Sequence, residues 1–236
     1  MSMITNAEIK KIRSLREKKF RDELGLFVVE GEKMVREAVD SGLEVESIWR
    51  RDEIGEAAMS RISQFTTPSP ALAVVRIPAA AASPEPGGLC LALDAVRDPG
   101  NMGTIIRLSE WFGVDTLFLS PDCVDIYNPK VIQATMGAIF RVRIVTADIP
   151  SVCREFRSRG LSVFGTFLDG SSIYATELPE EALVVMGNES NGIGPEVRAE
   201  VDAKLLIPSF GSSRSESLNV SVATAVTLSE FRRRTV

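Results

Sequence analysis

Short apolar runs alternate with amphipathic segments along the carboxyl-terminal part of the chain. The runs LCLALD, TLFLS, RVRIV, LSVFGTF, ALVVMG and LLIP have the length and composition of buried strands. Helical periodicity marks the segments GTIIRLSEWFG, PKVIQATMGAI, SVCREFRSRG and SLNVSVATAVTLSEFRRR. This alternation predicts an α/β fold with a mainly parallel sheet and helices on both of its faces.

The amino-terminal part has a different pattern. A basic amphipathic helix is predicted over Ile9–Lys19, in which Ile9, Ile12 and Leu15 recur at helical spacing. The runs LFVVEG, VESIW and LAVVRI are typical of strands, and EGEKMVREAVDSG is typical of a helix. The apolar face of that helix is predicted to contain Met34, Val35, Ala38 and Val39. Together these elements predict a small βαβ-like unit.

A tract rich in proline, alanine, serine and glycine separates the two patterns. It lies in the run PSPALAVVRIPAAAASPEPGG and has no periodicity after the short strand LAVVRI, which is typical of a linker. We therefore predict two domains, a small α/β domain over residues 1–84 and a larger α/β domain over residues 85–236.

The composition excludes several classes of chemistry. The chain has no histidine, so it has no Ser-His-Asp or Cys-His nucleophilic pair and no histidine zinc site. Cys90, Cys123 and Cys153 are widely spaced in apolar stretches, and we expect reduced structural thiols, without a disulfide or a metal site. The net charge of −5 argues against nonspecific coating of nucleic acid but permits a locally basic face.

The cellular location is predicted from what the chain lacks. No apolar run approaches the roughly 20 residues that a membrane-spanning helix needs, and the amino terminus is charged where a secretory signal is apolar. We expect a cytoplasmic protein with no membrane partner.

Polar residues and glycines gather in the loops that follow the predicted strands. Ligands bind at the carboxyl ends of strands in open parallel sheets. Asn101 and Arg107 follow LCLALD, Glu189 lies among three glycines in GNESNGIG, and Ser217 and Asn219 lie at the start of the last predicted helix. Each also has an ordinary explanation, since the amides and the serine can cap helices, Arg107 can form a surface ion pair and Glu189 can be a solvated carboxylate.

Three of these segments, taken in order, resemble a known family. DPGNMGTIIRLSEWFGVD, VVMGNESNGIG and IPSFGSSRSESLNVSVATAV resemble the three motifs of the SpoU/TrmH family of RNA 2′-O-methyltransferases. The resemblance covers residues 88–236. In addition, LREKKFRDELGLFVVEGEKMVREAV resembles the ribosomal-protein-like substrate-binding domain that often precedes these motifs. One departure is a serine-rich stretch before Leu218 that is longer than the family pattern.

The resemblance implies a specific fold, cofactor and set of partners. It implies a carboxyl-terminal trefoil knot, a homodimer, and transfer of a methyl group from S-adenosylmethionine, without a metal, to a ribose 2′-OH of structured RNA. The catalytic residues carried over by position are Asn101, Arg107, Glu189, Ser217 and Asn219. The cofactor would contact Thr166, Gly187, Asn188, Gly192, Ile207 and Leu218. RNA would bind Lys10, Lys11, Arg13, Lys18 and Lys19 of the predicted basic helix.

Without histidine, Arg107 is the candidate for activating the ribose hydroxyl. A free arginine is too weak a base, so the hypothesis is that its guanidinium and an RNA phosphate together orient and deprotonate the 2′-OH. Ribosomal RNA is favoured over transfer RNA by the ribosomal-protein-like first domain.

Other function classes fit the sequence less well. A dinucleotide-dependent dehydrogenase would need GxGxxG after its first strand, and a P-loop enzyme would need GxxxxGK[ST]; neither motif occurs. The serious alternative is a catalytically silent RNA-binding or ribosome-assembly protein with the same fold. The full set of candidate catalytic residues argues against it, because binding alone does not require them.

Overall fold

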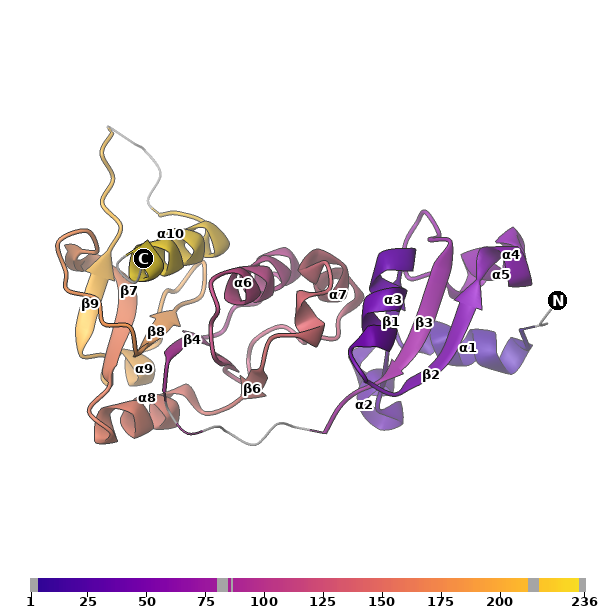
Figure 1. The fold of residues 1–236 in the computed structure, drawn as a ribbon, viewed down its shortest axis with the longest axis horizontal. Helices are drawn as coiled ribbons and strands as arrows, with labels where there is room; N and C mark the ends of the chain where they lie inside the picture. The colour runs from indigo at the N-terminus through magenta and orange to yellow at the C-terminus, as the bar shows by residue number, and fades with distance from the viewer. Residues whose placement is uncertain (1–3, 80–84, 86, 212–216, 234–236) are drawn as a thin grey trace. The chain divides into compact units, whose positions relative to one another are not determined.

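The computed structural model describes residues 4–79, 85, 87–211 and 217–233 (Figure 1). Its contacts divide the chain into two units. Unit 1 comprises Met1–Ala79 and Asp125–Arg141, and unit 2 comprises Ala80–Val124 and Val142–Val236. The division predicted from the sequence keeps residues 125–141 in the larger domain, whereas their contacts place them in unit 1.

Unit 1 is built on a three-stranded sheet in the order β1-β3-β2. Strands β1 (Leu26–Glu30) and β2 (Val45–Arg50) both pair antiparallel with β3 (Ala71–Arg76), so β1 and β2 run in the same direction. The helix α3 (Glu32–Asp40) connects β1 to β2. The predicted βαβ order is therefore present, with β3 inserted between its two strands. The unit is completed by the short helices α4 (Arg51–Ile54) and α5 (Glu56–Ile62).

Two details of unit 1 differ from the sequence-based prediction. The basic segment forms two helices, α1 (Asn6–Ser14) and α2 (Lys18–Leu24), in place of one helix over Ile9–Lys19. The break is stabilised by the buried Arg21, whose Nη1 donates at 2.8 Å to each of the carbonyls of Leu15 and Arg16 that the end of α1 leaves free. Val39 of α3, predicted in the buried face, is 48% exposed.

Residues 125–141 complete the core of unit 1. They form α7 (Pro129–Thr135) and a 3-10 turn, η1 (Ala138–Phe140), in place of the predicted single helix over PKVIQATMGAI. The interruption occurs at two residues with positive φ, Met136 at 53° and Gly137 at 99°. Ile132 of α7 belongs to the same apolar cluster as Phe27, and the rings of Phe27 and Tyr127 are 4.7 Å apart.

Unit 2 contains a six-stranded sheet in the order β6-β5-β4-β8-β7-β9, and every neighbouring pair is parallel. This confirms the predicted α/β fold with a parallel sheet. The strands are β4 (Leu89–Leu93), β5 (Leu117–Leu119), β6 (Ile144–Thr146), β7 (Ser162–Ser172), β8 (Ala182–Met186) and β9 (Ala203–Leu206). The chain builds outward from β4 to β6 and then returns on the other side of β4, so the strand order reverses between β4 and β8. Such a reversal is where open α/β sheets bind ligands.

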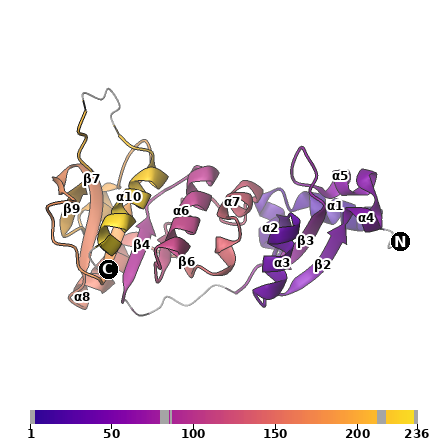
Figure 2. The same cartoon turned by 45° about the horizontal axis from the view of Figure 1, so that its top comes forward.

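Helices cover both faces of this sheet (Figures 1 and 2). On one face, α8 (Ile149–Ser158) and α9 (Pro195–Arg198) share an apolar cluster with the strands, including an edge-on contact between Phe118 and Phe156. On the other face, α6 (Pro99–Trp111) packs beside α10 (Val220–Arg233). The ring centroids of Phe231 in α10 and Phe164 in β7 are 5.5 Å apart. Among the described residues, no helix is long and apolar enough to cross a membrane.

All three cysteines are free thiols, as predicted. Burial raises the pKa of Cys90 to about 11 and that of Cys153 to about 12. Burial also raises the pKa of the partly buried Cys123. Such thiols are poor nucleophiles at neutral pH, which fits a structural role.

Candidate functional site

A cavity of about 430 Å³ opens at the carboxyl ends of the strands of unit 2. Its wall comes from five segments: the middle of β7, the end of β8 with the loop that follows, the end of α9, the end of β9 with the residue that follows, and the residues at the start of α10. All six residues predicted to contact the cofactor, Thr166, Gly187, Asn188, Gly192, Ile207 and Leu218, line this cavity. Its volume lies in the range of about 300–1,000 Å³ that small-molecule sites occupy.

The loop after β8 is held by its own backbone and by one side chain. Asn188 and Gly192 exchange two backbone hydrogen bonds, of 3.0 and 2.9 Å. The Asn188 Oδ1 accepts from the backbone N–H groups of Ser190 and Asn191, and its Nδ2 donates to the carbonyl of Ala95. Both polar atoms of its side chain are therefore engaged within the protein, and they hold the loop in shape.

Gly187 has a steric reason for lacking a side chain. A Cβ at this position would lie 2.3 Å from the carbonyl carbon of Gly192, where the loop folds back on itself. Any larger residue would push the two sides of the loop apart and deform the cavity wall.

The loop after β4 leads directly into α6. The Asp98 side chain caps the helix by accepting from the backbone N–H of Asn101 at 2.8 Å, and Pro99 occupies the first turn. Because Asp98 supplies the cap, the Asn101 side chain does not have to. The ordinary alternative, in which the Asn101 side chain caps this helix, is therefore not what the structure shows.

Asn219 joins the start of α10 to this group. Its Oδ1 accepts from the backbone N–H and the hydroxyl of Ser221, at 3.0 and 2.6 Å, and from the N–H of Val222. Its Nδ2 donates to the Asn101 Oδ1 at 2.9 Å. Asn219 is thus both a helix cap and a partner of Asn101.

A continuous hydrogen-bond chain results from these contacts. The Asn219 amide donates to Asn101, and the Asn101 Nδ2 in turn donates to the Glu189 Oε1 at 2.9 Å. A carboxylate only accepts, so Glu189 determines which way the Asn101 amide faces. Three predicted catalytic residues from three segments of the sequence are therefore assembled, and Glu189 also lines the cavity together with Ser217.

Arg107 is not part of this hydrogen-bond chain. It is exposed on α6, and none of the described residues forms a hydrogen bond or ion pair with its guanidinium. The alternative of a surface ion pair therefore has no support within the described chain. An exposed and unpaired guanidinium is available to a ligand outside the protein.

Several cavity residues are absent from the sequence-based prediction. Leu168, Asp169 and Arg198 line the cavity beyond Thr166, and the Asp169 carboxylate forms an ion pair of 2.9 Å with Arg198. The prediction ended the strand LSVFGTF at Phe167, whereas β7 continues to Ser172. A pairing irregularity between Thr166 and Ser171 lets β7 extend along β9, and local periodicity does not reveal such a feature.

The cations predicted to bind RNA all belong to unit 1. Lys11 forms an ion pair with Glu46, and Lys18 forms one of 2.6 Å with Asp22. Lys10, Arg13 and Lys19 are exposed. The serine-rich stretch that departs from the family pattern falls largely on residues 212–216, which lie outside the described residues.

No group of three or more histidine, cysteine or acidic side chains is placed to hold a metal ion within the described part of the chain.

Comparison with known proteins gives two family matches. Residues 88–229 match the model of the SpoU rRNA Methylase family, which is more than half of the chain. Residues 6–64 match the model of the MRM3-like substrate binding domain.

Individual relatives match along nearly the whole length. The 23S rRNA (guanosine(2553)-2′-O)-methyltransferase RlmP of Bacillus subtilis is 31% identical, over 96% of this chain and 96% of the relative. A solved structure of an RNA methyltransferase of the TrmH family from Porphyromonas gingivalis, described as putative, is 40% identical, with a TM-score of 0.91 over 99% of this chain and all of that one. The AdoMet-bound rRNA methyltransferase of Sinorhizobium meliloti is 30% identical, with a TM-score of 0.89 over 100% of this chain and 98% of that one.

Proposed function

The chain belongs to the SpoU rRNA methylase family and is an RNA 2′-O-methyltransferase that uses S-adenosylmethionine, and from this premise we propose that its substrate lies in ribosomal RNA. The Bacillus relative, which matches along nearly its full length, is named for a 23S rRNA nucleotide. Mapping 2′-O-methyl groups across total RNA, with and without the gene, tests the proposal. Loss of a ribosomal position would support it, and loss confined to transfer RNA would contradict it.

The observation that carries this function is the hydrogen-bond chain Asn219–Asn101–Glu189 beside the cavity. We propose that the cavity holds S-adenosylmethionine, which supplies a methyl group on a positively charged sulfur. The fit is chemical as well as geometric: Met186, Leu205 and Val220 provide apolar wall, and the loop 187–193 provides backbone donors and acceptors. Glu189 and Ser217 then lie on the wall where the ribose would meet the methyl group.

Arg107 is proposed to act on the RNA. Its exposed guanidinium would bind the phosphate beside the target ribose, and the pair would orient and deprotonate the 2′-OH. Arg107→Ala should then reduce methyl transfer by about 100-fold or more and leave cofactor affinity unchanged. Arg107→Lys should recover little of the methyl-transfer rate, because the point charge of lysine does not reproduce the planar guanidinium with its two parallel donors. Turnover near that of the wild type would remove Arg107 from the mechanism.

Cofactor binding and metal dependence can be tested together. S-adenosylmethionine, or its demethylated product, should raise the melting temperature, because a ligand of the native state stabilises it. We propose that no metal is required, since the sulfonium is already activated for methyl transfer. Activity should survive a chelator, and a strict need for a divalent ion in binding and turnover would contradict this.

Unit 1 is proposed to bind the RNA substrate through Lys10, Lys11, Arg13, Lys18 and Lys19. Replacing all five with neutral residues should weaken RNA binding and flatten its salt dependence, because fewer phosphates are neutralised. Cofactor binding should not change. An unaltered affinity and salt slope would mean that these charges only solvate the surface of unit 1.

We also propose a homodimer. Trp111 of α6 is 84% exposed, and tryptophan is enriched at protein interfaces. Trp111→Asp should shift sedimentation from dimer to monomer. A wild-type protein that sediments as a monomer at micromolar concentration would contradict the proposal. The trefoil knot and the cytoplasmic location stay predictions.

A further inference from the structure

The position of Glu189 depends on how its loop is attached to the rest of unit 2. Glu189 is exposed at the tip of the loop after β8, and its described hydrogen bond comes from Asn101. The exchange between Asn188 and Gly192 closes the loop upon itself. A closed loop can still pivot about its ends, so it needs attachments to the segment that carries Asn101.

Two side-chain bridges provide these attachments, one at each end of the loop. At the start, the Asn188 Nδ2 donates to the carbonyl of Ala95 at 2.7 Å. At the end, the backbone N–H of Gly194 donates to the Asp94 Oδ2, also at 2.7 Å. Both acceptors lie in the loop that leads from β4 to Asn101.

The backbone of the loop after β4 is fixed by hydrogen bonds to neighbouring segments. Strands β4 and β8 pair in register up to Leu93 and Met186, and one further backbone bond of 2.9 Å joins Asp94 to Met186. At Ala95 the chain turns sharply, with a φ of 57° that residues other than glycine rarely adopt. The N–H of Ala95 donates to the hydroxyl of Ser120 at 2.9 Å, which stabilises the turn while its carbonyl accepts from Asn188.

We propose that Asp94 is a positioning residue for methyl transfer: its carboxylate holds the Gly194 end of the loop so that Glu189 meets Asn101 and the cavity wall keeps its shape. Asp94 does not line the cavity, so it acts through the loop and not by touching the cofactor. The proposal rests on the proposed function. It extends the site to a residue outside the predicted set, and it assigns Asn188 to the same task at the other end of the loop.

A matched control exists at the opposite end of β4. The Asp115 Oδ2 accepts from the backbone N–H of Leu89 at 3.0 Å, at the amino end of β4. Asp94 and Asp115 thus make the same kind of carboxylate–amide bond at opposite ends of one strand, and only Asp94 is next to the candidate site. A general loss of sheet stability should affect both variants, whereas a positioning role should affect only Asp94.

The experiment measures kcat, KM and Kd for S-adenosylmethionine, with ribosomal RNA as acceptor, below the melting temperatures of all variants. Asp94→Ala should lower kcat and weaken cofactor binding, each by about tenfold or more, as expected for losing a hydrogen bond to a charged group. Asp94→Asn keeps an acceptor oxygen and should recover most of both. Asp115→Ala should lower the melting temperature and leave kcat and Kd within about twofold of the wild type.

Two further measurements keep the proposal testable if Asp94→Ala is poorly folded. Asp94→Glu retains the charge but displaces the carboxylate by one methylene, so it should show the same kinetic loss. In a Glu189→Ala background, the loss of kcat caused by Asp94→Ala should shrink to less than about threefold, because the two residues act through one loop.

Clear outcomes would overturn the proposal. These are unchanged kcat and Kd in Asp94→Ala, equal losses in the Asp94 and Asp115 variants, or fully additive losses with Glu189→Ala. A wild-type protein that transfers no methyl group to any RNA would instead refute the proposed function, so the two failures are distinguishable.

Discussion

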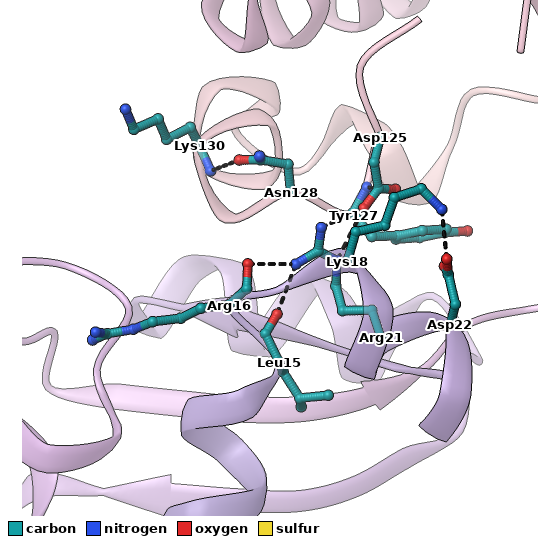
Figure 3. A network of polar contacts seen from close by, with 9 residues as sticks. All are labelled: Leu15, Arg16, Lys18, Arg21, Asp22, Asp125, Tyr127, Asn128 and Lys130. Atoms are coloured by element: carbon teal, nitrogen blue, oxygen red, sulfur yellow. Dashed lines mark hydrogen bonds and ion pairs between the residues drawn. The ribbon is translucent and has the colours of Figure 1, made fainter. Parts of the chain in front are cut away.

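Arg21 and Asp125, which lie 104 residues apart in the sequence, form a buried ion pair in unit 1 (Figure 3). Both Nε and Nη2 of Arg21 donate to the Asp125 Oδ2, at 2.9 and 2.5 Å, and the two side chains are 3% and 15% exposed. The Asp125 Oδ1 accepts from the backbone N–H of Tyr127. The pair therefore fixes the start of residues 125–141 to the junction between α1 and α2.

Breaking this pair should destabilise unit 1. Arg21→Met leaves the Asp125 carboxylate buried without its charged partner and frees the carbonyls of Leu15 and Arg16, so we expect a loss of about 3–5 kcal/mol in the free energy of unfolding. Urea denaturation followed by tryptophan fluorescence measures it. The control is Lys18→Met, whose pair with Asp22 is exposed and should contribute less than about 1 kcal/mol. Equal effects from the two variants would mean that burial does not strengthen the Arg21 pair.

A fragment that begins at Gly87 should aggregate when it is produced on its own. It would keep residues 125–141 without the rest of unit 1, which exposes Tyr127, Ile132 and Phe140. We expect aggregation in size-exclusion chromatography, because an exposed apolar cluster promotes association. The same fragment with polar residues at these three positions should remain monodisperse and bind S-adenosylmethionine. If the unmodified fragment is equally well behaved, these residues do not need their partners in unit 1.

Exchanging the hydrogen-bonding groups of Asn101 and Glu189 tests whether the hydrogen bond between them contributes to methyl transfer. Asn101→Asp removes the donor and sets two carboxylates against each other, which should slow methyl transfer by about 5- to 150-fold for a loss of about 1–3 kcal/mol. Asn101→Asp combined with Glu189→Gln restores a donor and an acceptor and should recover part of the rate. A double variant slower than either single one would show that the Glu189 charge, and not this contact, is what matters.

The buried thiols predict a pH dependence of stability. Burial raises the pKa of Cys153 to about 12, from 9.0 for an unperturbed thiol. The unfolded chain therefore loses this proton first, so the stability contributed by the neutral thiol is complete below pH 9.0 and declines above it, by up to about 1.4 kcal/mol per pH unit.

Urea denaturation at pH 7 to 10 checks this expectation. Between pH 9 and 10, the free energy of unfolding should fall more steeply for the wild type than for Cys153→Ala. Parallel curves for the two proteins would contradict the assigned burial of this thiol.

The sequence by itself determined most of the strands and helices, and it determined which loops carry the candidate site residues. All six strands predicted for unit 2 are present, although β7 continues to Ser172 and β6 begins only at Ile144, because runs such as ALVVMG are buried on both faces and therefore continuously apolar. The loops that lead to Asn101, Glu189 and Asn219 follow strand ends, and the carboxyl ends of parallel strands meet at one edge of the sheet. Residue type and spacing along the chain are sufficient for both conclusions, whereas the cofactor contacts of residues such as Thr166, Ile207 and Leu218 are implied only by the family resemblance.

Only the tertiary structure decided which distant groups satisfy one another. The basic segment divides at Leu15 because Arg21 folds back onto the freed carbonyls and pairs with Asp125, a partner that helical periodicity cannot identify. Asp94 likewise resembles any loop carboxylate until the amide of Gly194, 100 residues away, comes within 2.7 Å. Periodicity reports which face of an element is buried, whereas the partner of a polar group depends on the path of the whole chain.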